Sequence, residues 1–453
     1  MKLYTIFVLL ICSLPIYAQK HGLGLLLADS LYANSPTAVP LMRGDYSDLP
    51  DSASLKKFAP IPKNQGGDGT CAGWATAYAG RTILEAMDNG WSQSTIDSNA
   101  FSPSFIYNQI RKYPGCKYGT SLVDALNVLK FQGDEKLKDF AYNCSLPVTN
   151  VDKIKAAQYK IIEYREIAKS TTEHKDLFIR KSIAEGRPVV IAFDCPFSFD
   201  NAGKVWLPDS SDYKVWNRGH ALAVIGYNNN KYKGAFQIMN SWGTNWGNNG
   251  FTWMRYSDLD FFCKYAFEII DKSRINKNEP DLSGSLLFKL ANGDLMKPKF
   301  NGKYFQMMSS YPTGTLFQLH ISNNEPAYVY AFSTDLTYKS YKIFPFTKRM
   351  VAYLPYRGSN VAIPDEDSYN MLDSTAGKSY YVFLYSKKEL NINYIMNEFE
   401  KSNGNAWQRL VSVLKSDMID EKDIDFKTLY DLTFSAKSED KSVVPILIEI
   451  NHT

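Results

Sequence analysis

The sequence is poor in the side chains that bind metals and in charge of one sign. It holds 5 His and 6 Cys in 453 residues, and no two cysteines have CxxC spacing, which argues against a structural zinc site. The 51 basic and 47 acidic residues leave a net charge of +4, too small for a nucleic-acid groove or a polybasic membrane surface. We therefore expect no metal, no cofactor and no nucleic-acid partner.

Long apolar runs are also missing, because after the N-terminus nothing approaches the ~20 residues that span a bilayer. Hydrophobic residues make up 45% of the chain and charged residues 22%, which is ordinary for a folded protein and excludes general disorder. At ~100–200 residues per domain, the length predicts two to four domains.

The N-terminus has the pattern of a secretory signal peptide. Lys2 precedes an apolar run over Ile6–Leu14, and the small residue Ala18 marks the expected cleavage point, so residues 1–18 would be removed. The run is too short for a membrane anchor. A lipoprotein signal would use Cys12, but Ile11 stands where a small residue is needed. We expect a secreted or periplasmic protein with no integral membrane segment after signal removal.

Residues 19–49 show no sustained period and are expected to form a short N-terminal segment. A compact unit over residues 50–272 begins with helical patterns at Cys71–Met87 and Ser121–Phe131. Four β-type runs follow, at Pro188–Phe193, His220–Tyr227, Ala235–Met239 and Phe251–Met254. Helices first and strands later indicate an α+β unit and not an alternating parallel sheet.

A polar, turn-rich stretch at Asp271–Gly284 predicts a linker, placed at residues 273–284. Residues 285–453 then show short aromatic and β-branched runs separated by Gly and Pro, typical of a β-sandwich or barrel. The runs lie at Ser285–Leu290, Thr315–Ile321, Ala327–Ser333, Tyr380–Tyr385 and Val443–Ile450. A helical stretch interrupts them near Ile392–Phe399.

Four features of the first unit suggest an activated thiol. Gln65 precedes Cys71 by six positions across a glycine-rich loop, His220 lies on a β-type run, and Asn240 opens the sequence NSWG. A helix N-terminus and a nearby imidazole both favour a thiolate at Cys71. Asn240 could orient the imidazole, and the Gln65 amide could donate to an oxyanion, a contact worth roughly 3–4 kcal/mol. Trp242 would cover the hydrogen bond between histidine and asparagine.

The segments PKNQGGDGTCAGWA, GHALAVIGY and NSWGTNWGNNGF resemble blocks of the papain-like cysteine peptidases, in the same order. The likeness covers about Pro50–Lys272 and extends more loosely to GCKYGTSLVDAL from Gly115. It implies a two-lobed fold, with a helical lobe and a β-barrel-like lobe, followed here by a mainly-β, sandwich-like C-terminal domain. It also implies a bacterial, secreted enzyme. The implied catalytic residues are the nucleophile Cys71, the base and acid His220, the orienting Asn240 and the oxyanion donor Gln65.

Some positions depart from the family pattern. Ala72 and Gly73 stand between the nucleophile and Trp74, where the family has tryptophan directly after the cysteine, and the long helical pro-region is missing. Asp68 replaces a cysteine whose usual partner would be at position 116. The resemblance therefore leaves Cys116–Cys144 as the favoured disulfide and Cys195–Cys263 as a weaker second pair.

The predicted function is that of an exported cysteine endopeptidase, which hydrolyses protein or peptide substrates through a Cys71 thioester. A non-catalytic peptide-binding or adhesive protein with a papain-like cleft is the alternative, and a cell-wall amidase is a third possibility. The C-terminal domain weakly resembles a bacterial β-rich domain of unassigned function, through PAYVYAFS and GKSYYVFLYSKKEL. It could bind a cell-surface or protein partner.

If Cys71 and His220 form a thiolate–imidazolium pair, the pKa values of both groups should be shifted. The pKa of Cys71 should lie below the unperturbed ~8.5 and that of His220 above ~6.5. Activity should then follow a bell-shaped pH curve that belongs to the pair.

Overall fold

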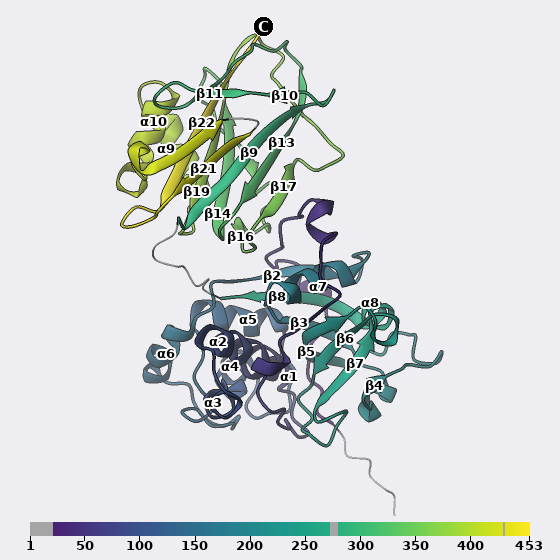
Figure 1. Cartoon of the computed structure of the whole chain (residues 1–453). Coiled ribbons are helices and arrows are strands. Elements are labelled where there is room, and N and C mark those ends of the chain that lie inside the picture. The colour runs from purple at the N-terminus through teal and green to yellow at the C-terminus, as the bar shows by residue number, and fades with distance from the viewer. Residues whose placement is uncertain (1–20, 272–279, 429–430) are drawn as a thin grey trace, which may run out of the picture.

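The computed structural model describes residues 21–271, 280–428 and 431–453. The predicted signal peptide and most of the predicted linker lie outside these residues. Figure 1 shows two units, a mixed α+β unit with elements up to β8 and a β-rich unit that begins at β9. The α+β class and the β-rich C-terminal part expected from the sequence are both confirmed.

The helical lobe of the first unit is built around a helical stretch that begins at Cys71. It comprises α1 (Cys71–Gly73), a π-helical segment (Trp74–Arg81) and α2 (Thr82–Asn89), and all its residues up to Leu84 are buried. Around it pack α3 (Gln93–Asn99), α4 (Pro103–Ile110), α5 (Leu122–Phe131) and α6 (Asn150–Ala156). Ser121 caps α5 by accepting hydrogen bonds from two backbone amides, so this helix begins where the sequence predicts.

The second lobe of this unit is a largely antiparallel sheet in the order β2-β8-β3-β5-β6-β7-β4, with β1 paired to β5. The strands are β1 (Ser52–Ser54), β2 (Glu163–Lys169), β3 (Val189–Asp194), β4 (Val205–Trp206), β5 (Gly219–Asn228), β6 (Ala235–Met239), β7 (Phe251–Arg255) and β8 (Cys263–Ile270). Helices α7 (Lys175–Ala184) and α8 (Tyr256–Phe262) complete it. Strand β5 is buried along almost its whole length, which fixes His220 rigidly between the lobes.

The C-terminal unit is a sandwich of two sheets. One sheet has the order β17-β13-β9-β21-β20, with β10 and β18 attached to it, and the other has the order β11-β12-β22-β19-β14-β15, with β16 attached. The strands of the first are β9 (Leu282–Leu290), β10 (Leu295–Met296), β13 (Leu316–Asn323), β17 (Ser359–Ile363), β18 (Asn370–Met371), β20 (Ile424–Thr428) and β21 (Leu432–Ala436). Those of the second are β11 (Pro298–Phe300), β12 (Phe305–Met307), β14 (Ala327–Thr334), β15 (Tyr341–Phe344), β16 (Tyr353–Leu354), β19 (Gly377–Ser386) and β22 (Val443–His452).

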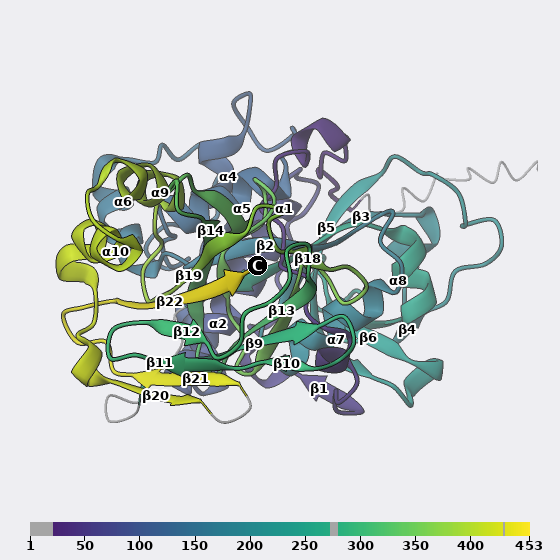
Figure 2. The same ribbon diagram turned by 90° about the horizontal axis from the view of Figure 1, so that it is seen from above.

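The sequence of β19 is a continuous apolar run because successive side chains point to opposite faces of the sheet and both faces are buried. Tyr381 and Phe383 face the core between the two sheets, whereas Val382 and Leu384 face the helices α9 (Ile392–Lys401) and α10 (Ala406–Leu414). Figure 2 shows these two helices side by side at one side of the unit. The central strands of the second sheet are therefore buried on both faces.

Residues 21–49, which we call the strap, connect the two units. The strap contains short 3₁₀ turns at Asp29–Leu31 and Arg43–Tyr46 and is otherwise irregular, as the sequence predicts. It runs from the lobes of the first unit to the base of the C-terminal sandwich (Figure 1). The sequence gives no indication of this path.

A buried ion pair lies where the two units meet. Arg165 of β2 donates to Glu268 of β8 over 2.7 Å, and the hydroxyl of Tyr356 donates to the same carboxylate over 2.6 Å. The two charged side chains are 2% and 0% exposed. Because Tyr356 belongs to the C-terminal unit, this cluster joins the units through a desolvated charge pair.

Candidate functional site

The predicted site residues converge between the helical lobe and the sheet. Cys71 begins the first helix, His220 lies on β5, Asn240 follows β6 directly, and Gln65 lies in the loop before the helix. Cys71 and His220 are fully buried, and Asn240 and Gln65 are nearly so. The structure thus brings all four together from distant parts of the chain.

The imidazole of His220 is fixed from two sides. Its Nε2 lies 2.8 Å from Oδ1 of Asn240, which therefore accepts a hydrogen bond from the ring. The indole of Trp242 stacks on the ring, with centroids 4.6 Å apart and an interplanar angle of 21°. The other nitrogen, Nδ1, is buried and has no hydrogen-bond partner among the described residues. This tautomer leaves Nδ1 as the nitrogen free to take a proton.

The thiol of Cys71 lies beside β5, the strand that carries His220. The backbone amides of Ala221 and Gly24 both face the sulfur and favour its anion. Ala221 directly follows His220 on β5, so the thiol and the imidazole come from adjacent points of the two lobes.

Burial reverses the expected pKa shifts in this arrangement. Desolvation raises the pKa of Cys71 to about 11 and lowers the pKa of His220 to about 4, although the hydrogen bond to Asn240 acts in the opposite direction on the histidine. The expectation of a thiolate and an imidazolium is therefore wrong for this closed state. Both shifts favour the neutral thiol and the neutral imidazole, because neither group reaches water in this closed state.

The Gln65 amide is held in a defined orientation. Its Oε1 accepts a hydrogen bond from the hydroxyl of Ser241, while its Nε2 donates to the carbonyl of Asp68 over 2.6 Å and to that of Gly22 over 3.2 Å. Sequence reasoning did not identify Ser241 as the residue that orients this amide. A backbone carbonyl from the strap thus already occupies the direction in which the Gln65 N–H points.

Cys116 and Cys144 lie at disulfide-bonding distance, with their Cα atoms 5.4 Å apart. Asp68 lies beside them, and these three residues are the one cluster with metal-ligand spacing among the described residues, but a disulfide would remove both thiolates. Hydrogen bonds, and not a disulfide at position 68, hold the loop that contains Asp68. Oδ2 of Asp68 accepts a hydrogen bond from the Tyr142 hydroxyl over 2.9 Å, and Gly69 N donates to the carbonyl of Cys116 over 2.6 Å.

The second expected disulfide, Cys195–Cys263, is wrong. Both cysteines are free and fully buried. Strand pairing explains this, since Cys263 of β8 lies opposite Phe193 of β3, and Cys195 lies beyond the end of β3. Their sulfurs face different backbone carbonyls, those of Tyr265 and Pro196.

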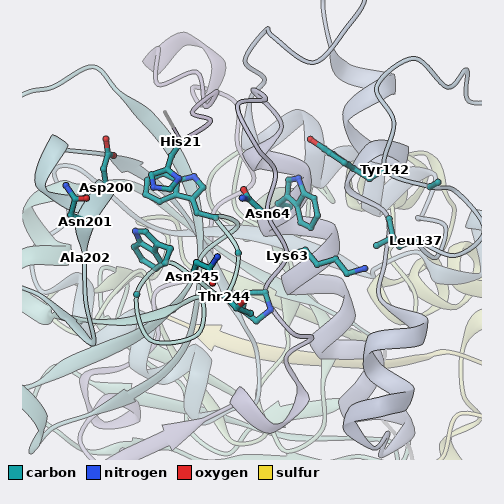
Figure 3. A pocket seen from close by; sticks show the side chains of 17 residues that line it. His21, Lys63, Asn64, Leu137, Tyr142, Asp200, Asn201, Ala202, Thr244 and Asn245 are labelled. Atoms are coloured by element: carbon teal, nitrogen blue, oxygen red, sulfur yellow. The ribbon is translucent and has the colours of Figure 1, made fainter. Parts of the chain in front are cut away.

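An open cavity of about 1090 Å³ adjoins the site on the far side of Trp242. In Figure 3, Asp200 and Asn201 lie on one side of it and Tyr142 and Leu137 on the other, with His21 between them. His21, which has no motif in the sequence, stacks on Trp242 with centroids 4.4 Å apart. The cavity has a polar and aromatic lining.

Comparison with known proteins agrees with this geometry. The family model described as papain family cysteine protease matches residues 51–269. Mouse cathepsin K is 26% identical over 223 residues, which are 49% of this chain and 63% of that protein. Zingipain-2 of Zingiber officinale is 25% identical over 217 residues, 45% of this chain and 86% of that protein.

Among solved structures, xylellain, a cysteine protease from Xylella fastidiosa, is 23% identical with a TM-score of 0.46, covering 56% of this chain and 97% of that one. No helix in the described ranges has both the length and the apolar character needed to cross a membrane. Residues 51–269, a little under half of the chain, thus match the papain family of cysteine proteases, and the chain spans 63% of the length of cathepsin K.

Proposed function

We propose that the chain is an exported cysteine endopeptidase that uses Cys71, His220, Asn240 and Gln65. The observation that carries the proposal is the way the His220 ring is held. Asn240 accepts the hydrogen bond from Nε2, and Nδ1 is left without a partner in the described part of the chain. The next residue on the strand, Ala221, directs its backbone amide at the Cys71 sulfur. His320 and His452 also have one buried ring nitrogen without a partner among the described residues, so the position of His220 next to Ala221 is what distinguishes it.

In the proposed reaction, Nδ1 of His220 takes the proton of the Cys71 thiol as the sulfur attacks the carbonyl carbon of the scissile bond. The carbonyl electrons move to oxygen, and the N–H groups of Gln65 and of the Cys71 backbone donate to that oxyanion. When the carbonyl re-forms, His220 protonates the leaving amine and a thioester remains on Cys71.

The second half of the reaction uses the same residues. His220 removes a proton from water, the oxygen attacks the thioester carbon, and the collapse releases the carboxylic acid and the Cys71 sulfur. Asn240 holds the ring in one tautomer throughout. Trp242 excludes water from their hydrogen bond, because its indole covers one face of the imidazole.

The proposed substrates are polypeptides that cross the cleft in an extended form. The cavity beyond Trp242 offers Lys63, Asn64 and Asp200 to polar side chains on that side of the scissile bond. Export is proposed from the signal pattern and is supported by the Cys116–Cys144 pairing, which suits an oxidising compartment. N-terminal sequencing of the protein recovered outside the cytoplasm should begin at Gln19.

The direct test compares hydrolysis of unfolded casein by Gly24→Ala alone and by Gly24→Ala combined with Cys71→Ala or Cys195→Ala, because a side chain at Gly24 should expel the segment that covers Cys71. Cys195 is the matched control because it is also a free, fully buried cysteine in the same unit. Loss of activity only in the protein that carries Cys71→Ala supports the proposal, whereas equal cleavage by all three proteins contradicts it. Turnover of casein also separates the proposal from a non-catalytic peptide-binding cleft.

A further inference from the structure

The first part of the strap fills the catalytic cleft. Gly22 N donates to the carbonyl of Gly66 over 2.8 Å, and the Gly22 carbonyl accepts from Nε1 of Trp242 over 3.1 Å as well as from Gln65. Leu25 N donates to the carbonyl of Gly219, the residue before His220, over 3.0 Å. The backbone of residues 22–25 is therefore bonded to both lobes on either side of Cys71.

Strand-like pairing continues this contact along the helical lobe. Thr120 N donates to the carbonyl of Gly24 over 2.8 Å, and Leu26 N donates to the carbonyl of Thr120 over 3.0 Å, so Leu25 and Thr120 form a parallel bridge. Leu25 itself is 5% exposed and packs in the same apolar cluster as Cys71. This segment removes the nucleophile from solvent.

Two glycines make this close approach possible. A Cβ on Gly24 would lie 2.4 Å from the Cα of Gly69, and a Cβ on Gly22 would lie 2.3 Å from the carbonyl oxygen of Asp68. Both neighbours are backbone atoms, which cannot move aside as a flexible side chain can. Residues 21–27 thus fit the cleft closely only because these two positions carry no side chain.

The second part of the strap is bound to the C-terminal unit. Val39 and Leu41 lie in the apolar core cluster of the sandwich and are 2% and 9% exposed. The carboxylate of Asp45 accepts hydrogen bonds from both the backbone and the side-chain amide of Asn360, each over 2.7 Å. Met42 N donates to the carbonyl of that same asparagine over 2.8 Å.

The middle of the strap crosses the junction between the units. Thr37 N donates to the carbonyl of Arg349 over 2.7 Å, and Val351 N donates to the Thr37 carbonyl over 3.0 Å. Ala38 N donates to the carbonyl of Glu166 on the edge strand β2 over 2.9 Å. The strap is therefore clamped between a strand of the first unit and a loop of the second, a few residues after the cleft segment ends.

We propose that the C-terminal unit is the anchor of an autoinhibitory strap, and that the surface around Asn360 and Met350 binds residues 37–45 of this same chain so that residues 21–27 stay in the cleft. Only the activity readout of this proposal rests on the proposed peptidase function.

Tethering explains how so short a segment can block the site. A segment held by a short linker has an effective concentration on the order of 1 mM, against roughly 10 µM for the same segment free in an assay. A cut that frees the segment should therefore lower the ratio of occupied to open cleft about 100-fold. The raised pKa of Cys71 agrees with this closed state, because the covered thiol stays protonated at neutral pH.

The test measures alkylation of Cys71 by iodoacetamide at neutral pH, resolved by peptide mass spectrometry. Cys195 and Cys263 serve as internal reporters, since both are free, buried and distant in sequence from the strap. A general loss of structure exposes all three thiols, whereas opening of the strap exposes Cys71 alone. The ratio of Cys71 to Cys195 labelling is therefore the measured quantity.

Two perturbations of the full chain address the two ends of the strap. Gly24→Ala should expel the cleft segment, and Gly44→Ala is its matched control because nothing lies within 4 Å of a Cβ at that position. The second perturbation places a specific protease recognition sequence at the exposed residues Ala33 and Asn34, with the uncut protein as control. Cutting there separates the cleft segment both from residues 37–45 and from the covalent link to Pro50. A cut at the exposed residues Ser47 and Asp48 is therefore the matched control, because it severs only the covalent link.

We expect the labelling ratio to rise about 100-fold after the cut at Ala33 and Asn34 but not after the cut at Ser47 and Asp48, and to rise in Gly24→Ala but not in Gly44→Ala. If the two cuts raise the ratio equally, or if Gly24→Ala opens the site and the cut at Ala33 and Asn34 does not, the anchoring role of the C-terminal unit is refuted. If neither Gly24→Ala nor either cut changes the ratio, the strap does not shield Cys71 at all. Casein assays in parallel separate the two proposals, because an exposed thiol without casein cleavage would overturn the peptidase function and leave the strap intact.

Discussion

Replacing Asn240 by alanine tests how the imidazole is held. The substitution removes the acceptor that lies 2.8 Å from Nε2 of His220 and leaves that nitrogen without a partner in a fully buried position. Trp242 still stacks on the ring, so the imidazole keeps its plane but loses the contact that selects its tautomer. The effect should therefore fall on the chemical step and not on substrate binding.

The expected magnitude follows from the cost of an unsatisfied buried group. Leaving such a group unpaired costs roughly 1–3 kcal/mol, and a middle value of about 2 kcal/mol corresponds to about a 30-fold loss in kcat/KM. Because the strap covers Cys71, the comparison is best made in the Gly24→Ala background with a short peptide substrate. Asn248→Ala is the control, since Asn248 is exposed in the turn that follows the same strand.

The pH profile gives a second readout, which a general loss of stability would not change. Asn240→Asp places a carboxylate beside the ring, which favours the imidazolium and raises the pKa of His220. Because activity in the open enzyme falls as the imidazolium loses its proton, the alkaline limb should move to higher pH. Unchanged kcat/KM in Asn240→Ala, together with an unshifted limb in Asn240→Asp, would refute the orienting role of this residue.

Three further predictions follow from the site and the junction. Gln65→Ala should lower kcat at least about 100-fold with little change in KM, measured in single-turnover assays, and an effect on KM alone would contradict an oxyanion role. Replacing Cys116 and Cys144 by serine should lower the free energy of unfolding by ~3–4 kcal/mol, because their bond would close a loop of 28 residues. Urea titration checks this, and an unchanged midpoint would argue against the bond. Glu268→Gln should cost ~3–5 kcal/mol in the same assay, because it leaves a buried arginine without its carboxylate, and exposed Glu173→Gln should cost almost nothing.

The candidate site was predictable because its chemistry resides in short local motifs. Gln65, Cys71, His220 and Asn240 each stand in a recognisable block, and β5 and β6 lie where apolar runs predict strands. The runs of the C-terminal unit likewise became the strands of a sandwich. These elements carry their signal within a few consecutive residues.

The sequence does not reveal β2 and β8, and the reason is buried charge. Glu163 and Arg165 interrupt β2, and Glu268 interrupts β8, yet all three are at most 2% exposed. Their partners come from elsewhere in the chain, for example Lys130, which donates to Glu163 over 2.6 Å. A strand whose charges are neutralised by distant residues has no apolar alternation for sequence reasoning to find.

The strap and the pKa shifts of Cys71 and His220 escaped prediction for a related reason. Residues 21–27 have no period, and their hydrogen bonds run to Gly66, Thr120 and Gly219, each far away in sequence. The expected thiolate assumed a cleft open to water. Only the assembled fold shows that a segment of the chain itself excludes the water.

The position of β22 in the sandwich determines when, during synthesis, the C-terminal unit can fold and hold the strap. This strand lies between β12 and β19 and pairs with β19 over ten residues, although it is the last strand of the unit to be synthesised. Roughly 170 residues separate the end of β8 from the start of β22. At ~5–20 residues per second, their translation takes about 10 to 35 s. During that interval the lobes that carry Cys71 can be complete while the anchor of the strap is not. Ribosome-bound chains that stop before Val443 should therefore label at Cys71, and released chains that include β22 should not.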